Sequence, residues 1–103
     1  MSLLGIHHIA IICSDYDTSK AFYCDVLGLE VVAETYREQR DSYMLDLMLP
    51  DGTQIELFSF PNPPERVSSP EAQGLRHLAF RSILFIAMWI TCNQKASMLN
   101  LFV

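Results

Sequence analysis

Three side chains of the kinds that bind divalent metals lie on separate segments of this chain: His8, Glu56 and His77. Each lies in a short segment in which the positions that alternate with this polar side chain are largely aliphatic. Because alternate side chains of a β-strand point to the same face, the aliphatic positions are predicted to pack under helices. The three polar side chains are then predicted to meet on the opposite, concave face.

Two imidazoles and one carboxylate form a ligand set for Zn²⁺, Ni²⁺, Co²⁺, Fe²⁺ or Mn²⁺. A histidine or glutamate on a packed sheet face is costly without a partner, and a metal would supply one. Taken singly, a strand histidine is usually a structural residue, and Glu56 alone would usually face solvent. The three together favour a metal site. His7 competes with His8, but the match between His8 and His77 favours His8.

Further polar side chains are candidates for substrate binding. Arg37, Arg40 and Arg81 are suited to bind a carboxylate or phosphate, although solvated charges are the simpler reading of each. Asp46 interrupts an apolar strand on the face of Met44 and Met48. If that face lines the cavity, Asp46 would orient a metal-bound group.

The elements that would position these residues follow a β-α-β-β-β order. A helix follows the first strand: Asp15 or Asp17 is expected to cap it, residues 19–27 continue it, and Gly28 ends it. A Pro-Asp-Gly turn separates the last two strands. The predicted strands span residues 6–13, 30–37, 42–49 and 54–60. The sequence therefore predicts an α+β fold.

A second module is predicted to begin after this unit. Residues 61–74 form a proline-rich linker, and a strand restarts at 75–81, where His77-Leu-Ala-Phe repeats the pattern of His8-Ile-Ala-Ile. Such repetition indicates an internal duplication. From Ser82 onward the chain contains no Asp, Glu, Gly or Pro. We therefore divide it into a first module (1–60), the linker, and a truncated or aberrant second module (75–103) with an apolar, helical tail.

Composition excludes several classes of partner. The formal charge is −5 and the basic residues form no cluster, which disfavours nucleic acid. Three cysteines without a close pair predict reduced thiols and a cytoplasmic location. The strongest apolar run is far shorter than the roughly 20 residues of a membrane helix. Unpaired strand edges and an apolar tail predict a homodimer.

Three segments carry a family resemblance: HHIAIICSDYDTSKAFYCDVLGLEVV, YREQRDSYMLDLML and IELFSFPNPPERVSSPEAQGLRHLAF. They resemble the vicinal oxygen chelate superfamily, in particular its small glyoxalase I-like branch related to lactoylglutathione lyase. The resemblance implies two βαβββ modules curved around a divalent metal, with His8, Glu56 and His77 as ligands. The family's fourth ligand, a Glu in the last strand of the second module, has no counterpart here.

The resemblance also implies an activity. A metal-dependent lyase of this type acts on a small molecule with vicinal oxygens through an enediolate, and Glu56 would be the catalytic base. Two alternatives remain open: a non-catalytic small-molecule-binding or resistance module of the same fold, and an inactive truncated fragment.

Overall fold

The computed structural model describes residues 1–83 and 87–91. The chain divides into two compact units, Met1–Pro63 and Pro64–Val103. The first unit carries most of the secondary structure and most of the predicted site residues.

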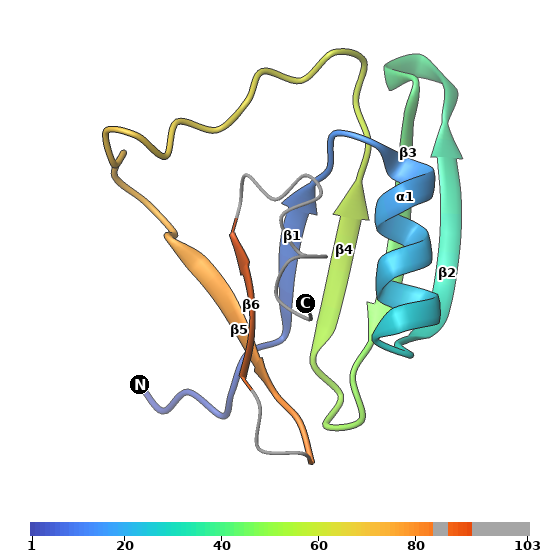
Figure 1. The fold of residues 1–103 in the computed structure, drawn as a ribbon. Coiled ribbons are helices and arrows are strands. Elements are labelled where there is room, and N and C mark those ends of the chain that lie inside the picture. The colour runs from blue at the N-terminus through green and yellow to red at the C-terminus, as the bar shows by residue number, and fades with distance from the viewer. Residues whose placement is uncertain (84–86, 92–103) are drawn as a thin grey trace. The chain divides into compact units, whose positions relative to one another are not determined.

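The first unit is a four-stranded sheet with a helical segment on one face (Figure 1). The strand order is β1-β4-β3-β2; β1 pairs with β4 in parallel, and the other neighbours are antiparallel. This confirms the predicted β-α-β-β-β order and the α+β class. The strands are β1 (His8–Ile12), β2 (Glu30–Arg37), β3 (Ser42–Met48) and β4 (Gln54–Phe58).

The helical segment begins after Asp15, the first of the two predicted caps. Asp15 is the N-cap of α1 (Tyr16–Ala21), and its carboxylate accepts a hydrogen bond from the Thr18 amide at 3.1 Å. The turn then widens into the π-helix η1 (Phe22–Val26). Gly28 follows with φ 72°, a left-handed conformation that favours glycine and ends the helix as predicted. A 3₁₀ turn, η2 (Glu38–Arg40), connects β2 to β3.

The core of the first unit lies between this helical segment and the sheet. Of the aliphatic positions predicted to face a helix, Ile11, Ile55 and Leu57 are buried and Ile9 is half-buried, because these strands alternate as expected. Burial of each large aliphatic side chain contributes about 1.5–3 kcal/mol relative to exposure. We call this side of the sheet the helix face and the opposite side the site face. The buried apolar core residues are Ile11, Cys13, Phe22, Tyr23, Leu45, Leu47, Ile55 and Leu57.

The second unit contains an antiparallel pair formed by β5 (His77–Arg81) and β6 (Ala87–Thr91), in which His77 is opposite Thr91. The predicted helical tail is therefore wrong over residues 87–91. A short apolar run is compatible with either state, and the free backbone groups of β5 are satisfied by a paired strand. The remainder of the predicted tail helix, 84–86 and 92–103, lies outside the described residues.

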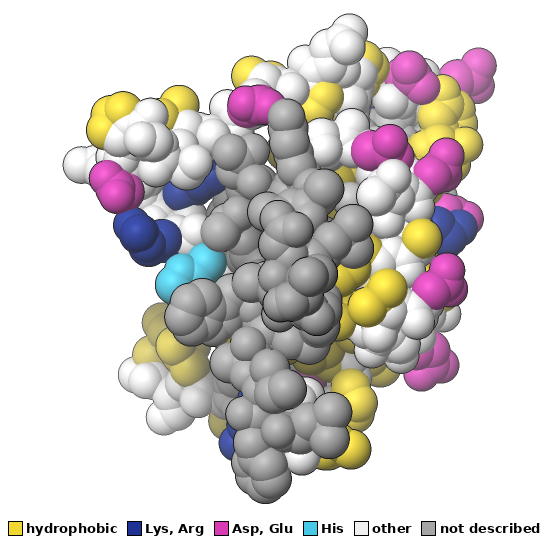
Figure 2. Space-filling model, viewed as in Figure 1, with side chains coloured by type: hydrophobic (Ala, Val, Ile, Leu, Met, Phe, Trp, Pro, Cys, Tyr) yellow, Lys and Arg dark blue, Asp and Glu magenta, His cyan; other side chains and the backbone are white. Residues whose placement is uncertain are grey.

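The surface of the first unit reflects the acidic composition. Acidic side chains gather on the side of the molecule where β2 and α1 lie (Figure 1 and Figure 2). None of the helices in the described part of the chain has both the length and the apolar character needed to cross a bilayer.

Candidate functional site

The structure brings His8 and Glu56 together on the site face. In the parallel β1–β4 pair, Glu56 is opposite Ala10 and His8 is opposite Gln54, so all four side chains are on one side of the sheet. The His8 Nε2 lies 3.6 Å from the Glu56 Oε1. The two side chains are 44% and 26% exposed, which leaves them accessible to a ligand.

His7 contacts the other side of the His8 ring. The Nδ1 atoms of the two rings are 2.8 Å apart, so one of them donates a hydrogen bond to the other. If the His8 Nδ1 is the donor, its Nε2 presents a lone pair towards Glu56. A ligating histidine commonly has this arrangement, with the second nitrogen held by a hydrogen bond. His7 therefore complements His8 in this geometry.

Asp46 lies beside Glu56. The two residues are opposite each other in the antiparallel β3–β4 pair, and their side chains share the site face. The Asp46 Oδ1 is buried and has no hydrogen-bond partner within the described residues. Two neighbouring carboxylates, one with an unsatisfied buried oxygen, form an environment that a bound cation would stabilise.

These observations account for two of the proposed metal ligands, His8 and Glu56. An imidazole nitrogen and a carboxylate oxygen are suitable first ligands for a divalent cation, with Asp46 beside them. Within residues 1–83 and 87–91, however, no group of three or more His, Cys, Asp or Glu side chains is placed to hold a metal. His77 and Arg81 are the first and last residues of β5, in the second unit.

Arg37 lies on the site face at the end of β2. Its Nη2 donates a hydrogen bond to the Ser42 Oγ at 3.1 Å. Its guanidinium carbon lies 5.2 Å from the ring centroid of Phe58 and 5.8 Å from that of Phe60. This arrangement holds a cationic group over the aromatic rings of Phe58, the last residue of β4, and Phe60.

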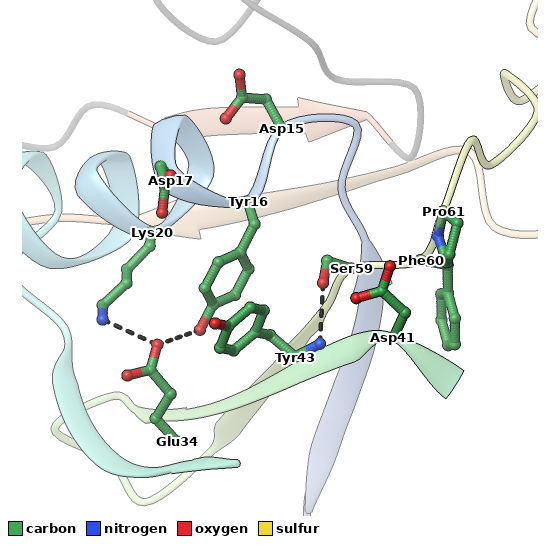
Figure 3. Close-up of a pocket in the computed structure, with 10 residues that line it drawn as sticks. All are labelled: Asp15, Tyr16, Asp17, Lys20, Glu34, Asp41, Tyr43, Ser59, Phe60 and Pro61. Carbon is green, nitrogen blue, oxygen red and sulfur yellow. Dashed lines mark hydrogen bonds and ion pairs between the residues drawn. The ribbon is translucent and has the colours of Figure 1, made fainter. Parts of the chain in front are cut away.

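A separate pocket of about 530 Å³ lies in the first unit, lined in part by α1, β2 and β3 (Figure 3). The Tyr16 and Tyr43 rings stack inside it, with centroids 4.7 Å apart and an interplanar angle of 12°. Glu34 accepts hydrogen bonds from the Tyr16 hydroxyl and, at 2.9 Å, from the Lys20 Nζ. Glu34 is opposite Leu45 in the sheet, which places this network on the helix face, away from His8 and Glu56.

This network shifts the ionisation of its members. The hydrogen bonds from Tyr16 and Lys20 lower the pKa of Glu34, and the bond to Glu34 raises the pKa of Lys20. Burial and the hydrogen bond to Glu34 raise the pKa of Tyr16. Because these contacts satisfy the charges within the protein, the pocket is less suited than the site face to metal chemistry. Sequence reasoning missed the network, since no local pattern links a helix lysine to a particular strand glutamate.

The chain belongs to the Glyoxalase/Bleomycin resistance protein/Dioxygenase superfamily, whose family model matches residues 5–92. This confirms the resemblance drawn from the sequence. It agrees with the fold, in which a βαβββ sheet carries the His8–Glu56 pair on the face away from its helix.

Relatives of known sequence and structure support this assignment. The chain is 68% identical over 80 residues to the uncharacterized protein YwkD of Bacillus subtilis and 62% identical to the uncharacterized protein YaeR of Escherichia coli. The match covers 78% of this chain and 62% of each relative, so the chain spans about three fifths of the length of these curated relatives.

Two solved structures share the fold at 44% identity: a glyoxalase family protein from Enterococcus faecalis, with a TM-score of 0.72, and SMU.1112c, with a TM-score of 0.73. Each match covers 80% of this chain, with 64% and 67% of those chains respectively.

Proposed function

We propose that this chain is part of a metal-dependent glyoxalase-type lyase that acts on a small molecule with vicinal oxygens. The observation that carries the proposal is the 3.6 Å approach of the His8 Nε2 to the Glu56 Oε1 on the site face. The unpartnered Asp46 oxygen beside this pair supports it, as does membership of the superfamily.

In this proposal His8 and Glu56 hold a divalent cation together with His77, and the metal is Zn²⁺, Ni²⁺, Co²⁺, Fe²⁺ or Mn²⁺. When bound, such a cation polarises a substrate carbonyl and stabilises the negative charge of an enediolate. Asp46 orients polar groups at the site, and Arg81 binds the substrate together with Arg37.

Glu56 is the proposed catalytic base. Its carboxylate removes a proton from the carbon next to the carbonyl, and the electron pair of that C–H bond moves towards the carbonyl oxygen. Return of the proton to the neighbouring carbon completes an isomerisation in which no atom is gained or lost. The 26% exposure of Glu56 allows a substrate to reach it from the site face.

We also propose that the protein acts as a cytoplasmic homodimer. Cys13 and Cys24 are free thiols in the structure, as expected in a reducing compartment. β2 is an edge strand with exposed apolar side chains at Val31, Val32 and Tyr36, which a second copy would cover.

The experiment is a calorimetric titration of the metal-free chain with Ni²⁺ and Zn²⁺, followed by a methylglyoxal–glutathione assay of the loaded protein. We expect His8→Ala and Glu56→Gln each to weaken metal binding by at least tenfold. Asp25→Asn is the matched control, because Asp25 is exposed in η1 and loses the same charge as Glu56→Gln. Metal affinity that is unchanged in both site variants would refute the proposal.

A non-catalytic small-molecule-binding module is the second candidate. The His8–Glu56 pair, which is accessible on the site face, would also serve such a binding module. Ligand affinity that persists in EDTA, without turnover in the presence of metal, would distinguish this function from the lyase.

A further inference from the structure

Two arginines lie near the ring of Phe60, in the segment that follows β4. Arg40, in η2, has its guanidinium carbon 5.0 Å from the Phe60 ring centroid, and Arg37 approaches the same ring to 5.8 Å. The rings of Phe58 and Phe60 are themselves stacked, with centroids 6.0 Å apart and planes within 10°. This cluster, Arg37, Arg40, Phe58 and Phe60, is called the arginine–phenylalanine cluster below.

The cluster holds two guanidinium groups that form no ion pair within the described residues. Across residues 1–83 and 87–91, Lys20 and Arg76 form ion pairs, whereas Arg37, Arg40, Arg66 and Arg81 do not; Arg37 and Arg40 differ from the other two in sharing one aromatic ring. Two guanidinium groups held near one ring repel each other, and a bound anion would relieve that repulsion.

The hydrogen bonding of Arg37 also favours the binding of an anion. Its Nη2 donates to the Ser42 Oγ, and its Nε is buried without a hydrogen-bond partner in the part of the chain that the structure describes. The aromatic rings and Ser42 therefore fix the guanidinium in place. A guanidinium that is held in one orientation loses less conformational freedom when it binds a planar or tetrahedral oxyanion.

The distance from the cluster to Glu56 defines the length of a ligand that could span both. Phe58 and Phe60 follow Glu56 at two and four residues along the chain. At about 3.3 Å per residue, the rings are roughly 7–13 Å from Glu56 along the strand direction. An extended chain advances a little over 1 Å per bond, so a ligand that spans this distance has about six to eleven bonds between its two ends.

We propose that Arg37 and Arg40 bind an oxyanion, a carboxylate or a phosphate, at one end of the small molecule whose vicinal oxygens reach His8 and Glu56. This inference rests on the proposed function for the second end of the molecule. It restricts the substrate class to acids or phosphate esters that carry the anionic group several bonds away from the reacting carbons.

The test is an NMR titration of the full chain with inorganic phosphate and, separately, with succinate, in EDTA and at low ionic strength. We expect saturable shifts of the backbone amides of Ser42 and Arg37. Arg37→Gln and Arg40→Gln should each weaken binding by about tenfold, because each removes a charge-assisted hydrogen-bond donor. Arg37→Lys keeps the charge but not the forked geometry, and should fall between wild type and Arg37→Gln.

Arg76→Gln is the matched control, since it removes the same charge from the second unit, where Arg76 pairs with Glu71. Binding of phosphate alone would assign a phosphate-bearing substrate, and binding of succinate alone a carboxylate. The inference is overturned if wild type binds neither probe, or if Arg37→Gln and Arg40→Gln bind as Arg76→Gln does. A parallel Ni²⁺ titration separates the two proposals: metal binding without oxyanion binding refutes only this inference, and the reverse refutes only the metal site.

Discussion

Replacing Asp46 with Asn is expected to stabilise the metal-free protein. Asp46 is opposite Glu56 in the β3–β4 pair, and its Oδ1 is buried without a hydrogen-bond partner among the described residues. Like charges directly opposite each other in a sheet destabilise it by about 0.2–1 kcal/mol. Asn removes this repulsion but leaves an unsatisfied polar group, so only the charge component is recovered.

We therefore expect Asp46→Asn to gain about 0.5–1 kcal/mol in unfolding free energy in EDTA. For a domain of this size the gain corresponds to a rise of about 2–8 °C in Tm. Thermal and urea unfolding followed by circular dichroism would measure it. Asp25→Asn, an exposed control with the same chemical change, should stay within about 0.5 kcal/mol of wild type.

In the presence of Ni²⁺, wild type should become more stable to unfolding than Asp46→Asn. At a free Ni²⁺ concentration of 100 times its Kd, wild type gains about 2.7 kcal/mol. If the loss of the Asp46 charge weakens binding tenfold, the variant gains only about 1.4 kcal/mol at the same concentration. The difference between these two gains, about 1.3 kcal/mol, exceeds the extra stability that Asp46→Asn is expected to have in EDTA. An Asp46→Asn protein that is less stable than wild type in EDTA, or equally stabilised by Ni²⁺, would refute this reasoning.

Two further predictions concern the helix face and the thiols. Because the folded-state pKa of Glu34 is lowered, its contribution to stability is present above the ordinary glutamate pKa and is lost as the pH falls through the folded value. Wild type should exceed Glu34→Gln by less than about 1 kcal/mol at pH 7 in urea unfolding, and a difference that is as large in acid as at pH 7 would contradict this. Cys13 is buried, which raises its pKa, and its thiol donates to the Phe58 carbonyl oxygen at 3.2 Å, whereas Cys24 is only half-buried. Iodoacetamide should therefore alkylate Cys24 before Cys13 in the native protein, as peptide mass spectrometry would show; faster labelling of Cys13 would contradict its burial.

The sequence predicted the sheet well because its strands alternate strongly. The bounds of β2 match the prediction at both ends, and the other strands of the first unit differ by a few residues at their ends. The sequence offers Asp15 and Asp17 as helix caps, and in the structure Asp15 is the cap, so that α1 begins at Tyr16. Residues 87–91 were predicted to be helical and form a strand, since an apolar run of that length carries no decisive period.

The site was predicted only in part. Alternation along β1 and β4 was sufficient to place His8 and Glu56 on one face, and the parallel register then brings them within 3.6 Å. The place of His77 in the site stays a prediction, because it depends on how modules assemble rather than on a local pattern. The arginine–phenylalanine cluster combines residues from a strand end, a turn and the chain beyond β4. Only the folded arrangement brings such residues together.

The most direct test of the metal site is an anomalous scattering map of crystals of the chain grown with Ni²⁺ or Zn²⁺. We predict a peak between the His8 Nε2 and a carboxylate oxygen of Glu56, about 2.0–2.2 Å from each, with the His77 imidazole completing the protein ligands. A peak bound to other side chains, or a metal-soaked crystal in which His8 and Glu56 contact no metal, would contradict the account.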